Sequence, residues 1–240
     1  MNLTHQFQKY YFQGEWHIHT NYTDGENSVD EYCWEAERTG IPLLAFTEHV
    51  RNDLSYKFDE LLNDISKAKE KYKQLVILSG CEAKVLPGGK LDCEEEIIKK
   101  CDYAIFAFHS FPADLKLYFE SLNFVINNYQ VHTWAHPGLF FKRLSIPISP
   151  DNFLEIFKAI KEKDINIEIN FKYKLPSLKL LDQYKKTEGN NNFIFGGDIH
   201  NIKQLKEINN LKLHQKINYQ ETNIETQDIS DFIVRSFNNV

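Results

Sequence analysis

The sequence predicts a single α/β domain folded as a distorted, TIM-like (βα)7 barrel. Two observations support this prediction. Short apolar runs alternate with helix-like amphipathic segments along the 240 residues, and short clusters of histidine and acidic residues follow most of the runs. Such an alternation favours parallel strands joined by right-handed crossovers. Seven strand-and-helix units favour closure into a barrel over an open sheet, and closure would gather the polar clusters at one end.

The predicted elements follow from local sequence patterns. Apolar, β-branched and aromatic runs predict strands over 15–19, 43–47, 75–80, 103–108, 131–135, 165–169 and 193–196. A period of 3.6 residues predicts helices over 28–38, 58–72, 93–100, 115–127, 151–163, 178–187 and 202–211. Ser28 with Glu31 three residues later, and Ser149-Pro150-Asp151, are typical helix starts.

The domain organisation is predicted to be simple. The polar clusters fall between about residue 14 and residue 201, and no repeat, linker or low-complexity tract divides residues 1–240. Residues 215–240 have weaker patterning. We expect them to form a peripheral segment with one short helix near 228–236.

Composition sets broad limits on function. Hydrophobic residues make up 42% and charged residues 26% of the chain, and no stretch approaches the roughly 20 apolar residues that a membrane span needs. The N-terminus lacks a signal-peptide pattern, and the four cysteines have no Cys-x-x-Cys spacing. We therefore predict a soluble, cytoplasmic protein with free thiols. The net charge of −6 gives no bulk attraction to nucleic acid or to anionic membranes.

The first polar clusters predict metal ligands. His17 and His19 are two residues apart on a strand, so both imidazoles can face one ion. Asp24 follows in the next loop, His49 ends the second apolar run, and Glu82 ends the third. A His-x-His pair or an isolated glutamate, taken alone, is more often a packing or surface residue.

Recurrence at the later strands strengthens the prediction. His109 and His136 end the fourth and fifth runs, and Asp198 and His200 follow the seventh after two glycines. One buried histidine is usually a hydrogen-bonded core residue, but packing does not explain a histidine or glutamate at the end of five successive strands. The donor set contains no thiolate, which suits two or three divalent ions of Zn, Mn or Fe in a hydrolytic centre.

These motifs resemble those of the PHP family, named for polymerase and histidinol phosphatase. The resemblance rests on HIHTNYTDG, FTEH, Glu82, FAFHSF, WAHPG and GGDIH, in that order, between about residues 14 and 201. It implies a metal-dependent phosphoesterase on a distorted (βα)7 barrel with three metal sites. By position, the first metal would have His17, His19, Glu82 and Asp198 as ligands.

The resemblance also implies the remaining ligands. Glu82 would bridge to a second metal held with His109 and His136, and a third would lie between His49 and His200. Some relatives have another histidine in the loop after the first motif. This chain has Asp24 there, so the occupancy or metal preference of the third site is expected to differ.

Residues 168–177 are similar to the histidinol-phosphatase branch, in which a strand ending in asparagine precedes a basic residue and Pro-Ser. Branch members usually have arginine where this chain has Lys172 and Lys174. Lysine can neutralise a phosphate but lacks the bidentate fork of arginine. Arg51, Arg143 and Lys142 are further candidates for substrate binding, although each basic residue alone is more often a solvated surface charge.

The predicted function is hydrolysis of a small phosphomonoester by metal-activated hydroxide, with L-histidinol phosphate, and hence histidine biosynthesis, as the leading assignment. Glu82, Asp198 and His200 are the predicted catalytic residues, and Asp198 or a bound water could protonate the leaving oxygen. The alternatives are a nucleotide phosphoesterase or nuclease, against which the acidic charge counts, and a non-catalytic metal-binding module. The sequence leaves the oligomeric state open, with a homodimer among the candidates.

Overall fold

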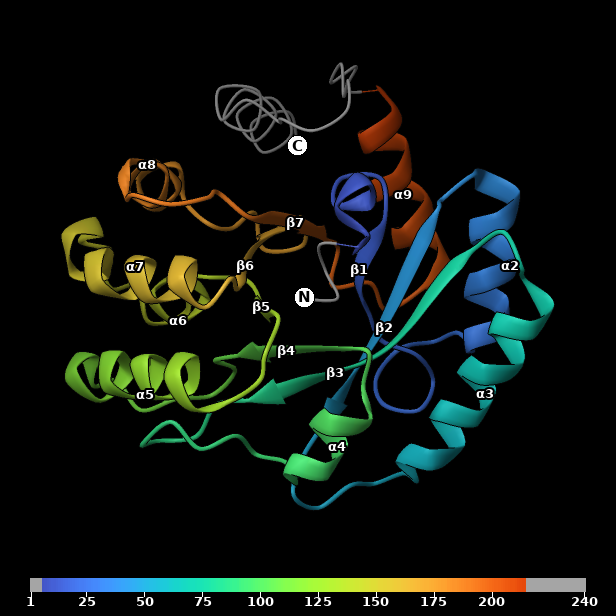
Figure 1. Cartoon of the computed structure of the whole chain (residues 1–240), viewed down its shortest axis with the longest axis horizontal. Coiled ribbons are helices and arrows are strands. Elements are labelled where there is room, and N and C mark those ends of the chain that lie inside the picture. Colours follow the sequence, from blue (N-terminus) through green and yellow to red (C-terminus); the bar gives the residue numbers. More distant parts are fainter. Residues whose placement is uncertain (1–5, 215–240) are drawn as a thin grey trace.

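A computed structural model describes residues 6–214 as one nearly closed barrel of parallel strands. The seven strands are hydrogen-bonded in sequence order (Figure 1). They are β1 (Glu15–Ile18), β2 (Leu43–Val50), β3 (Val76–Lys84), β4 (Tyr103–Ala107), β5 (Thr133–Trp134), β6 (Asn166–Asn170) and β7 (Phe193–Gly196). The predicted barrel with seven strands is therefore confirmed.

The barrel closes through the segment that follows β7. Ile18 and Ile199 form an isolated parallel bridge, in which the amide of His19 donates to Ile199 O at 2.8 Å and the amide of Ile199 donates to His17 O at 2.9 Å. This closure joins the first polar cluster of the sequence to the last one.

Helices surround the barrel (Figure 1). They are α2 (Val29–Thr39), α3 (Phe58–Lys71), α4 (Glu95–Lys100), α5 (Leu115–Asn128), α6 (Leu139–Leu144), α7 (Leu154–Glu162), α8 (Leu178–Lys186) and α9 (Ile202–His214), with 3-10 turns at η1 (Gln8–Tyr10) and η2 (Pro150–Phe153). The N-terminal cap expected from the sequence is present at α2. Ser28 and Glu31 form a capping box, and Gly40 ends the helix in the left-handed conformation with φ 75°.

Several predicted boundaries were wrong. Strands β2 and β3 continue to Val50 and Lys84, beyond the predicted ends at 47 and 80, because the ladder between them pairs every residue from Leu43↔Val76 to Val50↔Ala83. Strand β5 is limited to two residues, and α4 begins at Glu95 rather than at 93. The helix predicted over 151–163 begins as the 3-10 turn η2 and continues as α7 from Leu154. Pro150 occupies the start of that turn, where its missing N–H loses no hydrogen bond.

Helix α6 and turn η1 were missed. Helix α6 follows WAHPG directly and has only six residues, which is too short for a helical period to stand out. The short helix expected near 228–236 lies outside the described residues.

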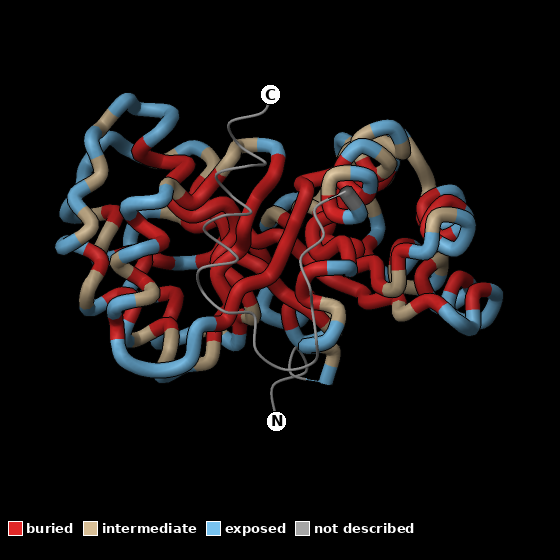
Figure 2. The backbone as a smooth tube through the Cα atoms, turned by 90° about the horizontal axis from the view of Figure 1, so that it is seen from above, coloured by how far each residue is buried: buried red, intermediate tan, exposed pale blue. Residues whose placement is uncertain are grey.

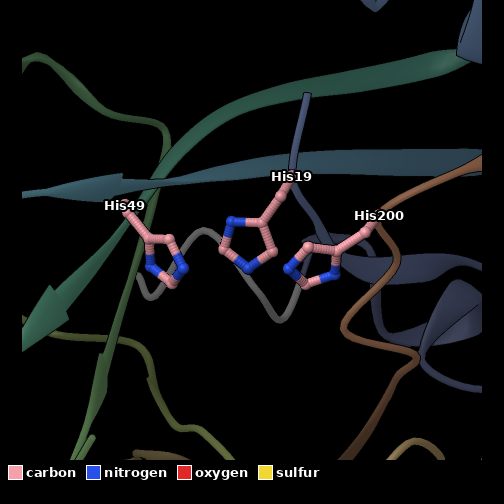
Figure 3. A group of neighbouring side chains, drawn as sticks. All are labelled: His19, His49 and His200. Atoms are coloured by element: carbon pink, nitrogen blue, oxygen red, sulfur yellow. The ribbon is translucent and has the colours of Figure 1, made fainter. Parts of the chain in front are cut away.

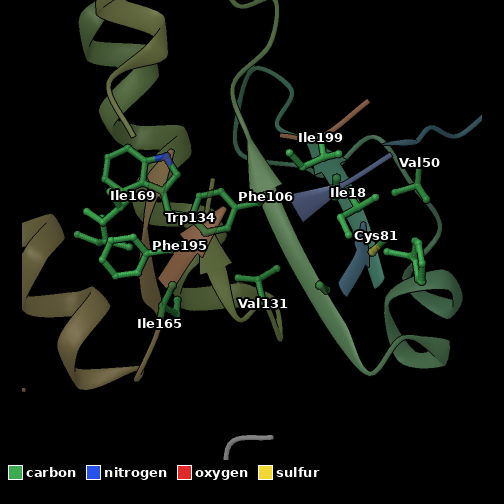
Figure 4. Close-up of a cluster of buried hydrophobic side chains, with 14 of the residues drawn as sticks. Ile18, Val50, Cys81, Phe106, Val131, Trp134, Ile165, Ile169, Phe195 and Ile199 are labelled. Carbon is green, nitrogen blue, oxygen red and sulfur yellow. The ribbon is translucent and has the colours of Figure 1, made fainter. Parts of the chain in front are cut away.

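The alternation of side chains along each strand divides the core into two parts. One cluster includes Leu43, Ala45, Leu78, Ile105 and Ile194, which face the inside of the barrel. The larger cluster lies between the strands and the helices, and Figure 4 shows part of it around Phe106, Trp134 and Phe195. The strands are buried on both faces and the exposed segments lie on the helices and loops (Figure 2), as expected for a parallel sheet.

The inward alternation continues into the polar residues at the strand ends. In β3 the inward series is Leu78, Gly80, Glu82, and in and after β4 it is Tyr103, Ile105, Ala107, His109. The barrel thus has an apolar interior that changes to carboxylate and imidazole at one end. Among the described residues, no helix is both long enough and apolar enough to cross a membrane.

Candidate metal centre

Glu82 lies at the centre of the polar cluster. Its Oε1 is 2.9 Å from His136 Nε2, 3.2 Å from His109 Nε2 and 3.7 Å from His17 Nε2. Its Oε2 is 2.8 Å from His49 Nδ1 and 3.6 Å from His19 Nε2. One carboxylate that is 1% exposed is therefore surrounded by five imidazoles from four segments of the chain.

Asp198 and His200 complete the side of the cluster next to β1. Asp198 Oδ1 is 3.3 Å from His19 Nε2 and 3.9 Å from His17 Nε2. His200 Nδ1 lies 3.5 Å from Asp198 Oδ1, and its Nε2 lies 3.2 Å from Asp24 Oδ2. Asp24 also approaches His49 Nε2, at 3.5 Å. All nine residues predicted as ligands are thus brought together at one end of the barrel.

Three groups within this set have the spacing of a metal site, with ligand atoms that all lie within 4.8 Å of one another. They are His17, His19 and Glu82; His49, Glu82 and His109; and His19, His49 and His200. Figure 3 shows the last group, in which the ring of His19 lies between those of His49 and His200. The shared members mean that neighbouring ions would have ligands in common.

The hydrogen bonding of the cluster fits bound cations. Among residues 6–214, His49 Nδ1 and Glu82 Oε2 are buried without a hydrogen-bond partner, as are the Nδ1 atoms of His19, His109 and His136. His49 Nδ1 and Glu82 Oε2 are 2.8 Å apart but do not have the geometry of a hydrogen bond to each other. Two unpaired buried polar atoms that face each other in this way are expected where a metal ion would satisfy both.

The electrostatics of the cluster favour positive charge. Burial raises the pKa of Glu82, but His109, His17 and His49 lower it, and the net pKa is well below 4.5. Burial also lowers the pKa of His49, yet Glu82 and Asp24 raise it to about 9. His17 behaves similarly: burial lowers its pKa, whereas Glu168 and Glu82 raise it well above 6.5. The charge of the carboxylates would therefore be balanced either by protonated imidazoles or by metal cations at this end of the barrel.

The pKa values of His19 and Asp198 are both lowered, in contrast to those of His17 and His49. Burial lowers the pKa of His19 to about 3, and the neighbouring His49 and His17 contribute to that shift. The pKa of Asp198 is well below 3.8 because hydrogen bonding to His19 and the charge of His17 overcome the effect of burial. An imidazole that stays neutral and a carboxylate that stays ionised are both in the protonation state that a metal ligand needs.

The predicted basic residues lie in the segments that follow β2, β5 and β6, and Lys172 contacts the cluster directly. Lys172 Nζ is 3.0 Å from Asp198 Oδ2 and 3.4 Å from His200 Nδ1. Lys174 lies in the same turn after β6, with a left-handed backbone at φ 55°. Arg143 donates to His109 O at 2.5 Å. Arg51 donates to Val50 O at 2.6 Å and lies 3.9 Å from Asp92.

Three buried glutamates that were not among the predicted site residues support the ligands. Glu168 contacts His17 and the backbone of His136, Glu15 accepts the amides of Gly197 and His17, and Glu48 accepts from Thr20 and Thr23. A charged residue inside an otherwise apolar strand of a parallel barrel is unusual. The run Ile165 to Ile169 contained that signal at Glu168.

Comparisons with known proteins agree with this geometry. The chain is 24% identical over 205 residues to "DNA polymerase/3'-5' exonuclease PolX" of Bacillus subtilis, covering 82% of this chain and 35% of that protein. It is 28% identical over 148 residues to a "Probable phosphatase" of Acetivibrio thermocellus, covering 60% and 58%. The chain thus spans less than two thirds of the length of these relatives.

A solved structure of histidinol phosphate phosphatase from Lactococcus lactis, complexed with Zn, L-histidinol and phosphate, has the same fold. Its TM-score to this chain is 0.60 at 19% identity, covering 82% of this chain and 92% of that one. The family model of the PHP domain matches residues 15–194, which include β1 to β6 and the start of β7. The chain therefore belongs to the PHP domain family.

Proposed function

We propose that this protein is a metal-dependent phosphomonoesterase, with L-histidinol phosphate as the leading substrate. The observation that carries the proposal is the arrangement of imidazoles around Glu82, next to Asp198 and with Lys172 at its edge. Bound divalent ions would supply Lewis acidity and lower the pKa of a water molecule, which is the chemistry that phosphate ester hydrolysis needs.

Lys172 would bind the phosphate in this proposal. Its ammonium is 3.0 Å from Asp198 Oδ2, and the side chain is 34% exposed, so it lies between the cluster and solvent. A cation there would neutralise the oxygens of a phosphoryl group entering from outside, and the effect would increase as charge builds up in the transition state. Lysine does this as a point charge, without the paired hydrogen bonds of arginine.

Tyr173 and Arg143 form the adjoining part of the rim. The Tyr173 ring lies 5.4 Å from that of His136, and the Arg143 guanidinium lies 5.9 Å from the tyrosine centroid. Lys172 Nζ also lies 5.3 Å from that centroid. An aromatic ring close to two cations would suit a substrate with a flat ring attached to its phosphate, such as the imidazole of histidinol phosphate.

The low pKa of Asp198 bears on the leaving group. A carboxyl group with a pKa well below 3.8 is ionised at neutral pH and has no proton to give. Of the two proton donors considered from the sequence, water is therefore favoured over Asp198, whose role would be that of a ligand and a partner of Lys172.

The histidinol phosphate assignment has two supports. One is the fold shared with the Lactococcus lactis enzyme, and the other is the similarity of residues 168–177 to the histidinol-phosphatase branch. The two lysines at positions where that branch has arginine count against it. The alternative of a nucleotide phosphoesterase or nuclease is favoured by the similarity to PolX and disfavoured by the net charge of −6.

The test is phosphate release by protein reconstituted with Mn or Zn, using L-histidinol phosphate, an aryl phosphate and a single-stranded oligonucleotide in parallel. A preference of at least tenfold in kcat/KM for histidinol phosphate is expected. Turnover of the aryl phosphate alone would support phosphomonoesterase activity and exclude histidinol phosphate as the substrate. Cleavage of the oligonucleotide alone would establish the nuclease alternative, and no turnover of any substrate would leave the non-catalytic module.

A further inference from the structure

Glu168 is a buried carboxylate in the middle of β6 with both oxygens fully engaged. Its Oε1 is 2.7 Å from His17 Nδ1. Its Oε2 accepts the backbone amide of His136 at 2.5 Å and the side-chain amide of Asn170 at 3.1 Å. The residue is 2% exposed. It therefore joins two predicted metal ligands that come from different strands.

The bond to His17 determines which nitrogen of that imidazole faces the cluster. An ionised carboxylate only accepts hydrogen bonds, so His17 Nδ1 must carry a proton that it donates to Glu168. Its Nε2 is then the nitrogen that can accept a metal ion, and this atom lies 3.7 Å from Glu82 and 3.1 Å from His19 Nε2. Hydrogen bonding of this kind behind a ligating histidine fixes its tautomer and orientation.

The bond to His136 acts on the main chain. His136 has φ 33°, in the left-handed region that residues other than glycine seldom occupy. Its amide donates to Glu168, and its Nε2 lies 2.9 Å from Glu82 Oε1. The carboxylate thus helps to hold a backbone conformation in which this imidazole lies against Glu82.

The neighbouring strand leaves space for this carboxylate. A Cβ added at Gly196 of β7 would lie 2.0 Å from Glu168 Oε1 and 2.9 Å from His17 Cβ. A side chain at position 196 would therefore displace Glu168 or His17. The absence of a side chain there is a requirement of the Glu168–His17 contact.

Glu168 differs from Glu82 in a way that separates their roles. Glu82 Oε2 has no hydrogen-bond partner among the described residues, whereas both oxygens of Glu168 accept hydrogen bonds from protein groups. Glu82 is free to bind a cation and Glu168 is not. We propose that Glu168 is a positioning residue, which aims the imidazoles of His17 and His136 at the metal centre without binding metal itself.

This inference rests on the metal centre of the proposed function but not on the substrate. The first test is Glu168→Gln, which keeps the shape and replaces one oxygen by NH2. In one rotamer the NH2 faces the donors of His136 and Asn170, and in the other it faces His17 Nδ1. Either way a donor meets a donor.

We expect the zinc affinity of Glu168→Gln to fall about 10- to 100-fold, measured by competition with a chromophoric chelator. The matched control is Glu35→Gln. Glu35 is also 1% exposed and hydrogen-bonded, to Arg38 at 2.6 Å, but it lies on α2 and contacts none of the ligands in the cluster. The control should bind zinc as tightly as the wild type. The visible spectrum of the Co(II) form, which reports ligand geometry, should change in Glu168→Gln alone.

A second variant covers the case in which Glu168→Gln fails to fold. Gly196→Ala keeps the carboxylate and displaces it, so zinc affinity should fall here too. Wild-type affinity in whichever of the two variants folds would overturn the inference, as would an equal loss in Glu35→Gln.

The inference and the proposed function fail in different ways. A wild-type protein that binds no zinc would overturn the metal centre and this inference with it. A wild type that binds zinc but hydrolyses no phosphoester, together with weakened binding in Glu168→Gln, would support the inference while removing the phosphatase assignment.

Discussion

His132 and His136 lie four residues apart, on either side of the two-residue strand β5, and their surroundings are opposite in kind. His132, before the strand, accepts the amide of Ala104 on Nδ1 at 3.0 Å, and burial lowers its pKa. His136, after the strand, has a left-handed backbone, an unpaired Nδ1 among the described residues and an Nε2 2.9 Å from Glu82. His132 is hydrogen-bonded within the barrel, whereas His136 directs its ring toward the polar cluster.

The same contrast holds for carboxylates at the two ends of the strands. Asp102, just before β4, accepts from Ser79 N and Oγ at 3.0 Å each and from Lys69 at 2.7 Å. Glu82, at the far end of β3, is surrounded by imidazoles and has one unpaired oxygen among the described residues. In a parallel barrel, residues at the end where the strands begin contribute to stability, and residues at the end where the strands finish carry function. The hydrogen bonding of His132 and Asp102, compared with that of His136 and Glu82, follows this rule.

The largest expected effect is that of Glu82→Ala. Removing the carboxylate shared by several imidazoles should release metal and lower phosphatase activity by at least about 1,000-fold, since metal ions contribute several kcal/mol to transition-state stabilisation. Metal content by mass spectrometry and phosphate release would be measured on the same samples. Normal metal content with normal activity would refute the cluster.

The paired substitution of the two histidines tests the comparison directly. His136→Ala should lower metal affinity and activity by about 10- to 100-fold with little change in folding. His132→Ala should keep its metal and lose about 1–3 kcal/mol of stability, because the buried amide of Ala104 would be left unpaired. Urea unfolding and metal titration of both variants would separate the structural role from the metal-binding role. Loss of metal in His132→Ala, with unchanged metal affinity in His136→Ala, would contradict the assignment.

Lys172→Ala should act on the substrate more than on the metal. We expect KM for phosphomonoesters to rise about tenfold, because one cation facing the phosphate is lost. Lys116→Ala, on the exposed face of α5, is the control and should leave KM unchanged. If metal content fell instead of KM rising, Lys172 would be a structural partner of Asp198.

The pH dependence of stability should also distinguish the two ends. In the metal-free protein the pKa of His49 is about 9, above its usual 6.5. The charged imidazole therefore stabilises the fold in full below pH 6.5, and this contribution is lost as the pH rises from 6.5 through 9. Urea unfolding across that range should show a decline that is smaller in His49→Gln. An identical decline in the variant would exclude His49 as its source.

The smallest effect is expected for Asp102→Asn. The pKa of Asp102 is lowered because Lys69 and Ser79 outweigh burial, so its ionised form stabilises the fold above pH 3.8 and that contribution is lost as the pH falls through the lower folded pKa. The variant should lose about 1 kcal/mol or less at pH 7 and keep its metal, since the carboxylate is partly exposed. Loss of metal in this variant would show that the two ends are coupled.

The sequence was most informative where chemistry and periodicity coincide. Apolar runs followed by His109 or His136 predicted both a strand and a ligand, and the structure brings these residues together at Glu82. Strand lengths were less predictable, because they depend on pairing with a neighbour. The ladder between β2 and β3 extends through His49 and Glu82, which a search for apolar residues excludes.

Glu168 was missed for a related reason. Its role depends on contacts with His17, 151 positions away in the sequence, and with a backbone amide of His136, which no local pattern encodes. Helix α6 was missed because two of its buried residues, Phe140 and Phe141, are adjacent and its six residues are too few to show a period. Long-range contacts and very short elements were therefore visible only in the structure.

The most direct test of the account is removal and return of metal. Protein stripped with a chelator would be assayed for phosphate release before and after addition of Mn or Zn, with bound metal counted per chain. The account predicts that activity disappears, returns as two or three ions bind, and does not return in Glu82→Ala. Full activity in protein shown to be free of metal would contradict it.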